Sequence, residues 1–281
     1  MSNKTIEIPN MILQIEITDL CNLKCIWCVQ SFDKWVYGTG SDTSPHQRHN
    51  MPEFRKGTKG FVDFSTYTTM IDDIYTSGII FDSISLMWIG ESLLHPKFFE
   101  ILDYMLIKNK HQKFVNTITL NTAGNRLTKE ISDLIIKYFT DKNNTTGLNL
   151  FFSLDVASKE SHKKYKGVNL FDKTIKNIKY FLNQIAICRE NDVDARINPI
   201  IQSLVFPEIY DDVENFMNYW VKFCRKINLD IQVVESEGGW DNNVDCTVFF
   251  KKGTGSNQIR LDELHSTIRD KLNLPKVYRR D

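Results

Sequence analysis

The chain has 281 residues, and its 35 lysine and arginine residues balance its 35 aspartate and glutamate residues, so the formal net charge is zero. Hydrophobic residues make up 42% of the sequence, which is enough for a large core and excludes a disordered chain. Without a positive surplus, binding to duplex nucleic acid or to an anionic membrane gains nothing from bulk electrostatics. The longest apolar run has five residues, whereas a membrane span needs about 20, so we expect no transmembrane helix.

The six cysteines need an explanation other than disulfides. The amino terminus lacks the basic and apolar segments of a secretory signal, so we interpret the protein as cytoplasmic and its thiols as reduced. Cys188, Cys224 and Cys246 are scattered singly and are expected to be buried or incidental thiols. The other three lie together near the amino terminus.

Apolar periodicity predicts strands that alternate with helices. Strands are expected at residues 11–17, 83–88, 116–121, 148–155, 195–202 and 230–235. Helices are expected at 65–77, 96–110, 128–139, 171–190 and 207–227, with Ser65 and Thr128 as helix N-caps. This order predicts parallel strands joined by right-handed crossovers, either in an open doubly wound sheet or in a complete or partial barrel. In both architectures the active-site residues lie at the carboxyl ends of the strands.

Two stretches lie outside this alternation. Residues 32–61 form a polar excursion, and residues from 238 onward hold glycine-rich loops and one amphipathic helix, expected at 261–272. The sequence contains neither an internal repeat nor a low-complexity linker. We therefore expect one domain with a small carboxyl-terminal appendage.

Directly after the first predicted strand, Cys21, Cys25 and Cys28 follow a C-x3-C-x2-C spacing in a tight loop. Thiolates bind zinc and iron–sulfur clusters. Structural zinc takes four ligands, and the fourth would have to come from His46, His49 or a distant cysteine. A four-iron cluster with three thiolate ligands instead leaves one iron open to a small molecule, which is typical of a catalytic centre.

This spacing, with the aromatic Trp27 just before the last cysteine, resembles the signature of the radical S-adenosylmethionine superfamily. The resemblance implies that Cys21, Cys25 and Cys28 hold a [4Fe-4S] cluster whose open iron binds S-adenosylmethionine (AdoMet), with Trp27 near the adenine. It also implies reductive cleavage of AdoMet to methionine and a 5′-deoxyadenosyl radical, which abstracts hydrogen from a substrate. Side chains cannot supply such one-electron chemistry, so a cofactor must carry it.

Segments after the next two predicted strands are similar to further motifs of this family. The segment around Gly90 and Glu91 resembles its Gly-Gly-Glu-Pro motif, with Ile89 and Ser92 as departures from the pattern. The resemblance implies that Gly90 and Glu91 meet the ammonium group of AdoMet. Asn121 begins a segment similar to the Thr-Asn-Gly turn that lines the site in the family.

The fourth and fifth predicted strands carry the remaining candidate AdoMet contacts. Ser153 and Asp155 belong to a segment similar to the family's Ser-Leu-Asp, which lies near the ribose hydroxyls or the substrate. Taken alone, Asp155 could equally cap the following helix. Arg196 and Asn198 point to the same face of the fifth strand, where they could hold the AdoMet carboxylate. A solvent-facing Arg196 is the alternative.

The resemblance covers about residues 11–235 and implies a partial (β/α)6 TIM-like barrel. We assign residues 1–237 to a radical AdoMet core with a polar insertion at 31–62, and residues 238–281 to the appendage. The pattern is closest to SPASM-type members but lacks the cysteines that hold their auxiliary clusters, since only Cys246 lies in the appendage. One thiolate cannot hold a cluster, so a single cluster is expected.

The leading hypothesis is a radical AdoMet enzyme that acts on a peptide or small-metabolite substrate and takes its electron from an external donor such as flavodoxin. A tRNA- or nucleotide-modifying enzyme of the same class is the alternative, which the zero net charge disfavours. A non-catalytic zinc-binding module is the rival from another class. Further candidate substrate contacts are Trp35, Tyr37, His46, His49, Glu235 and Glu237.

Overall fold

The structure is a computed structural model that describes residues 6–26, 28, 60–234, 244–252, 270 and 277–278. Its strands are β1 (Ile6–Gln14), β2 (Ile79–Ser85), β3 (Val115–Thr122), β4 (Gly147–Ser153), β5 (Ile197–Val205), β6 (Ile231–Val234), β7 (Cys246–Lys252) and β8 (Val277–Tyr278). Its α-helices are α1 (Phe64–Thr76), α2 (Phe98–His111), α3 (Lys129–Thr140), α4 (Lys159–Lys166), α5 (Phe171–Glu190) and α6 (Val213–Lys226). Short 3-10 helices cover Ser92–Leu94 and Pro207–Asp212.

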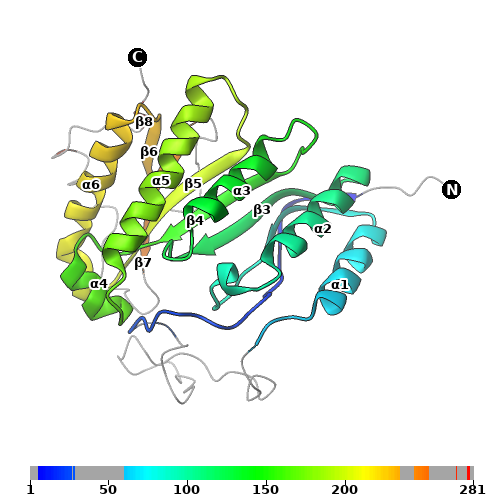
Figure 1. The fold of residues 1–281 in the computed structure, drawn as a ribbon, viewed down its shortest axis with the longest axis horizontal. Coiled ribbons are helices and arrows are strands. Elements are labelled where there is room, and N and C mark those ends of the chain that lie inside the picture. The colour runs from blue at the N-terminus through cyan, green and yellow to red at the C-terminus, as the bar shows by residue number, and fades with distance from the viewer. Residues whose placement is uncertain are drawn as a thin grey trace.

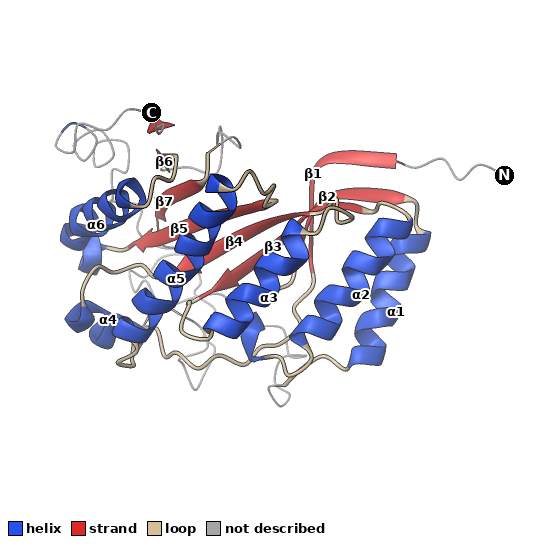
Figure 2. Ribbon diagram, turned by 45° about the horizontal axis from the view of Figure 1, so that its top comes forward, coloured by secondary structure: helices blue, strands red, loops and turns tan. Residues whose placement is uncertain are grey.

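The strands form one eight-stranded sheet in the order β1-β2-β3-β4-β5-β7-β6-β8. All pairings from β1 to β7 are parallel, and β8 is antiparallel to β6. Because β1 to β5 lie side by side in chain order, right-handed crossovers place their helices on one face, as Figures 1 and 2 show. This order excludes the doubly wound alternative and confirms the prediction of a partial, open barrel.

Strand β7 changes the expected division of the chain. It lies between β5 and β6, although its residues fall in the segment that the sequence assigned to the appendage. A boundary after residue 237 would therefore cut through the sheet. The strand was missed because its apolar run, 246–250, is short and stands alone among glycine-rich segments. Of the helix expected at 261–272, only Asp270 belongs to the described residues.

The main core lies between the sheet and the helices. Alternate residues of the parallel strands point to this side, and most of those in the middle of each strand are apolar because helices cover them. Phe152 of β4, for example, is fully buried and makes an edge-to-face contact with Phe181 of α5, with ring centroids 5.7 Å apart. The other strand residues in this layer include Ile84, Ile118, Leu120, Leu148, Leu150, Ile197, Ile201, Val248 and Phe250.

The opposite, inner face of the sheet has a different composition. The strand register aligns Ser85, Thr119, Asn149 and Asn198 in one row across β2 to β5. The Asn198 amide donates to Asn149 Oδ1 over 3.2 Å. Beyond this row, Phe151, Ile200, Phe249 and Val234 form a small apolar cluster across β4, β5, β7 and β6. On β7 and β6 the same face also carries Thr247 and Gln232, which are in register with Ile200, and the Gln232 amide donates to Thr247 Oγ1 over 3.0 Å. The inner face thus carries uncharged polar groups on all these strands, with one apolar cluster among them.

The helix starts test the predicted caps. Thr128 is the N-cap of α3, and its hydroxyl accepts a hydrogen bond from the Ile131 amide, as expected. Ser65 is not a cap, because α1 begins earlier, with Asp63 at the N-cap position. Helix α4 was not predicted because its sequence, KESHKKYK, has no apolar period. In the part of the chain that the structure describes, no helix is long and apolar enough to cross a membrane.

Candidate functional site

The segment that follows β1 carries the three clustered cysteines, and we call residues 15–28 the cysteine loop. Main-chain hydrogen bonds attach it to two other parts of the carboxyl edge of the sheet. Leu20 O accepts from the Glu91 amide at 2.8 Å, after β2. The Lys24 and Ile26 amides donate to carbonyl groups at the end of α4, each over 3.0 Å. In Figure 1 the loop is the blue trace that runs from β1 to α4.

Two glycines allow this close approach. A Cβ atom on Gly90 would lie 2.0 Å from Thr18 O, and a Cβ atom on Gly167 would lie 2.5 Å from Lys24 O. Both contacts are with backbone atoms, which cannot move aside as a flexible side chain can. Gly167 also has φ +73°, a conformation that favours glycine. The close approach of the Thr18 backbone therefore explains why residue 90 is a glycine. A contact between Gly90 and AdoMet stays a prediction.

The thiols of the cysteine loop are partly buried and close to one another. A turn closes between Cys25 and Cys28, with the Cys28 amide donating to Cys25 O at 3.0 Å. Burial raises the pKa of Cys25 to about 12, although the Lys166 charge opposes this, and Cys21 and Cys28 raise it further. Burial likewise raises the pKa of Cys21. Deprotonation of these thiols therefore needs a compensating positive group.

The three thiols are suitable ligands for a metal cluster, but their side chains are not arranged around a metal position in this structure. Among the described residues, no group of three or more histidine, cysteine, aspartate or glutamate side chains is arranged to hold a metal ion. The three thiols nevertheless lie within range of one another's charge, as the mutual pKa effects on Cys25 show. Metal ions deprotonate coordinating thiols outright, so a bound cluster would supply the missing positive charge.

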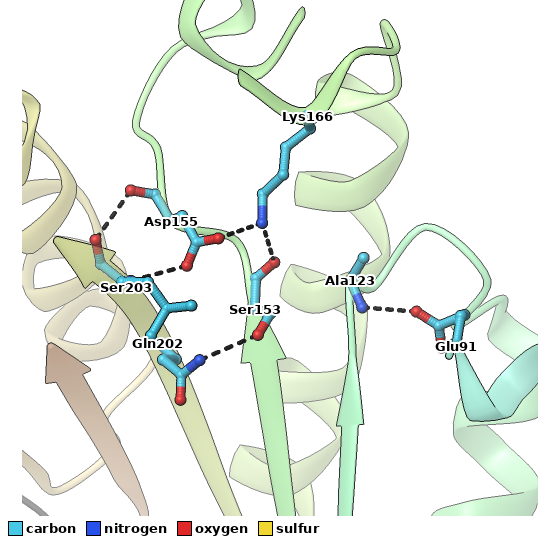
Figure 3. A network of polar contacts seen from close by, with 8 residues as sticks. Glu91, Ala123, Ser153, Asp155, Lys166, Gln202 and Ser203 are labelled. Carbon is cyan, nitrogen blue, oxygen red and sulfur yellow. Dashed lines mark hydrogen bonds and ion pairs between the residues drawn. The ribbon is translucent and has the colours of Figure 1, made fainter. Parts of the chain in front are cut away.

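Glu91 connects two loops at the carboxyl edge of the sheet. Its side chain is buried, and Oε2 accepts a hydrogen bond from the Ala123 amide at 2.8 Å, directly after β3 (Figure 3). Its other oxygen accepts from the Leu93 amide at 3.4 Å. Burial raises the pKa of the Glu91 carboxyl, although these hydrogen bonds oppose the shift. The carboxyl therefore links the loops that follow β2 and β3.

Asp155 is the centre of a second buried network, shown in Figure 3. It has φ 68°, and its carboxylate forms a buried ion pair with Lys166 of α4. Its Oδ1 accepts from the Leu204 amide at 2.9 Å, and its carbonyl oxygen accepts from the Ser203 hydroxyl at 2.9 Å. Burial opposes the charge on Lys166, but the attraction of Asp155 and Cys25 raises the pKa of Lys166. Both carboxylate oxygens of Asp155 thus have partners inside the protein.

The alternative role of Asp155 as a helix cap is wrong. The N-cap of α4 is Ser158, whose hydroxyl accepts from the Ser161 amide at 3.1 Å. Asp155 instead fastens the end of β4 to β5 and to α4. Lys166 extends this link, because its ammonium group also donates to Ser153 O at 3.1 Å.

Ser153 and Asn121 lie at their predicted positions, at the carboxyl ends of β4 and β3. Both are on the inner face, because Asn121 is in register with Phe151, two residues before Ser153. The Ser153 hydroxyl accepts from Gln202 Nε2 at 3.1 Å. Gln202, which the sequence reasoning missed, therefore completes the polar edge on β5.

Arg196 and Asn198 lie at the wrong end of the sheet for the predicted role. Arg196 precedes β5 at the amino edge, where it pairs with Asp194 over 2.7 Å. Six residues, or about 20 Å of strand, separate it from Gln202 at the carboxyl end. Asn198 is the second residue of β5. The assignment failed because the two residues were chosen for sharing one face of the strand, although both already lay near the amino end of the strand predicted at 195–202.

Several candidate residues fall outside the described part of the chain. Trp27 is one of them. The others are the candidate substrate contacts Trp35, Tyr37, His46, His49, Glu235 and Glu237. Cys224 and Cys246 are buried, as expected for structural thiols.

No protein-family model matches the sequence, and neither does any curated protein. Solved structures do match the fold. Native anSMEcpe with bound AdoMet has a TM-score of 0.53 and 16% identity, over 87% of this chain and 52% of that chain. The same protein with bound AdoMet and Cp18Cys peptide has a TM-score of 0.52 and 14% identity, over 86% of this chain and 50% of that chain.

The present chain thus spans about half the length of the structures that it matches. At 14–16% identity, the likeness concerns the path of the backbone. The chain has the partial (β/α)-barrel fold of these AdoMet-bound structures.

Proposed function

We propose that this protein is a radical AdoMet enzyme in which Cys21, Cys25 and Cys28 hold a [4Fe-4S] cluster. The observation that carries the proposal is the three-cysteine loop, fixed by main-chain hydrogen bonds at the carboxyl edge of a partial barrel. When bound, the cluster and AdoMet supply the one-electron chemistry that abstracts hydrogen from a substrate. The electron comes from an external donor such as flavodoxin.

The side chains at this edge divide into two roles in the proposal. Glu91 and Asp155 are positioning residues, because their carboxylates are bonded to neighbouring loops. Asn121, Ser153 and Gln202 contact AdoMet through hydroxyl and carboxamide groups, which can donate and accept without adding charge. Gly90 lets the loop after β2 approach the cysteine loop. Trp27 is proposed to pack near the adenine.

The inner face supports a peptide or another uncharged polar substrate. Thr119, Asn149 and Asn198 offer hydroxyl and carboxamide groups on the face away from the helices. Such groups suit the amides of a peptide backbone or the hydroxyls of a small metabolite. Bound peptides in the matched anSMEcpe structures favour the peptide.

The test is anaerobic reconstitution with iron and sulfide, followed by dithionite and AdoMet. We expect about four iron atoms per chain and formation of 5′-deoxyadenosine above a no-protein control. Cys25→Ala should lower both to background while circular dichroism stays that of the folded barrel. Cys188→Ala is the matched control, because Cys188 lies near the end of α5, outside the cysteine loop, and should leave both unchanged. AdoMet cleavage by Cys25→Ala, or about one zinc and no iron in the wild-type protein, would contradict the proposal.

A further inference from the structure

A group of exposed lysines lies next to the cysteine loop in a chain whose net charge is zero. We call this group the lysine surface, and it comprises Lys24, Lys159, Lys163, Lys164, Lys173 and Lys176. The exposed acidic residues of α4 and the first two turns of α5 are Glu160 and Asp172. Six positive and two negative side chains leave a local surplus of four positive charges. Charge is therefore concentrated here.

The lysine surface covers the outer side of the cysteine loop. Lys24 belongs to the loop itself, between Cys21 and Cys25. Its amide donates to the Lys166 carbonyl at 3.0 Å, which joins the loop to the end of α4. Cys25 packs against the hydrophobic cluster that includes Tyr165 of α4. The end of α4 therefore lies directly against the cysteine loop, as the ribbon in Figure 1 shows.

The frame that presents these lysines is rigid. Helix α4 has Ser158 as its N-cap and ends at Gly167 in the left-handed conformation. His162 Nδ1 lies 3.0 Å from the Val168 carbonyl oxygen, within hydrogen-bonding distance, and Lys159 forms an ion pair with Asp172 of α5. These contacts hold the helix without the charges of Lys163 and Lys164.

Lys163 and Lys164 are free for a partner. Within the described residues neither forms an ion pair, and the Lys164 ammonium group lies over the Tyr165 ring, 4.8 Å from its centroid. Two neighbouring lysines in the last turn of a short helix add repulsion, partly offset by the helix dipole. An acidic partner would remove this repulsion. Electrostatic complementarity of this kind chiefly raises association rates.

We propose that the lysine surface docks an acidic one-electron carrier protein over the cysteine loop. This inference rests on the proposed function, because it gives the cluster its reductant. The reduced carrier loses one electron and the cluster gains it, so no bond forms or breaks. A small, salt-sensitive contact is typical of transient electron-transfer partners. The zero net charge of the chain is compatible with this docking, because the carrier would contact only the locally positive lysine surface.

RNA is the other polyanion that such a surface could bind, and the composition favours a protein. The cysteine loop, α4 and the first two turns of α5 contain no arginine, the residue suited to bidentate phosphate contacts. In α4 the one aromatic side chain, Tyr165, is buried and offers no exposed ring on which a base could stack.

The experiment compares two reductants on the reconstituted holoenzyme. Formation of 5′-deoxyadenosine is measured with dithionite and, separately, with flavodoxin kept reduced by its NADPH-dependent reductase. Lys163→Glu with Lys164→Glu should lower the flavodoxin-driven rate about tenfold at low salt and leave the dithionite-driven rate unchanged. The wild-type flavodoxin-driven rate should also fall as NaCl rises from about 50 mM to about 300 mM.

The matched control is Lys137→Glu with Lys142→Glu, at the end of α3 and in the following loop, near the amino edge of the sheet. It carries the same charge change, with one of its two lysines in the last turn of a helix, and should leave both rates unchanged. Lys163→Gln with Lys164→Gln is the second variant, which removes two charges without adding repulsion. Its flavodoxin-driven rate should lie between those of the wild-type protein and the charge reversal.

Equal losses with both reductants, or an unchanged flavodoxin-driven rate, would overturn the docking proposal. Loss of RNA binding in the reversal variant with flavodoxin reduction intact would assign the surface to RNA instead. If the wild-type protein forms no 5′-deoxyadenosine with dithionite, the proposed function fails separately. Flavodoxin binding by calorimetry then decides the docking: salt-sensitive binding that the reversal abolishes supports it, and no binding overturns it.

Discussion

The two faces of the sheet are built from different side chains, although each strand contributes to both. Toward the helices, β4 presents Leu148, Leu150 and Phe152, which are fully or almost fully buried. Toward the open side, the same strand presents Asn149, Phe151 and Ser153, which are partly exposed. The first set stabilises the fold, and the second is available to ligands. The comparison shows how the barrel separates stability from recognition within a single strand.

The inner face is itself divided. On β3 and β4 its hydroxyl and carboxamide groups are partly exposed. Across β5, β7 and β6 the side chains of this face are buried, both the apolar Ile200, Phe249 and Val234 and the polar Gln202, Thr247 and Gln232. An uncharged polar substrate would therefore meet the β3–β4 part, and the buried part would act as its wall.

Two neighbouring phenylalanines, one on each face of β4, provide the most direct test of the difference between the two faces. Phe152→Ala removes a fully buried ring from the helix-facing layer and should cost about 3–5 kcal/mol of unfolding free energy. Phe151→Ala is its control on the inner face, where the ring is partly exposed, and should cost less than half as much. Urea denaturation of both variants measures the difference. Similar losses for both would mean that the inner face is packed as tightly as the helix-facing layer.

A second test concerns the buried ion pair between Asp155 and Lys166. Lys166→Met leaves the Asp155 carboxylate buried without its partner and should cost about 3 kcal/mol of unfolding free energy. Adding Asp155→Asn removes the unpaired charge, and asparagine tolerates the positive φ of this position. The double variant should therefore recover most of the loss in the same denaturation measurement. If the double variant is no more stable than Lys166→Met, the loss of stability in Lys166→Met does not come from the unpaired Asp155 carboxylate.

The smallest expected effect lies at the edge where the two faces meet. Gly90→Ala places a Cβ atom 2.0 Å from Thr18 O, so the cysteine loop must shift at a cost of about 1–3 kcal/mol. Iron content after reconstitution should fall with it. Gly60→Ala is the control, because nothing lies within 4 Å of its Cβ position. Full iron content in Gly90→Ala would show that the loop tolerates this shift.

Much of the fold could be predicted because helix-facing residues repeat with a regular apolar period. Helices α3 and α5 and strands β3 and β4 were expected within a few residues of their observed bounds. Helix α4 and strand β7 were missed for opposite reasons. The helix is almost entirely polar and is fixed by its cap and tertiary contacts, whereas the strand is short and its place in the sheet is set by non-local pairing.

The site was predictable where a motif fixes local geometry and not where a strand end decides it. Three cysteines at short spacing must share one loop, so that loop could be located from the sequence. Gln202 lies near the carboxyl end of β5 and Arg196 just before the strand begins, and the alternation of faces alone does not show which of them reaches the carboxyl edge. The steric need for glycine at 90 depends on the backbone of Thr18, far away in sequence, and left no local signal.

The position of β7 between β5 and β6 has a consequence for biosynthesis. Until residue 252 has left the ribosome, neither β5 nor β6 can form its full set of main-chain hydrogen bonds, because both pair with β7. Until then the nascent chain exposes two open strand edges, and such edges are prone to pair with other chains.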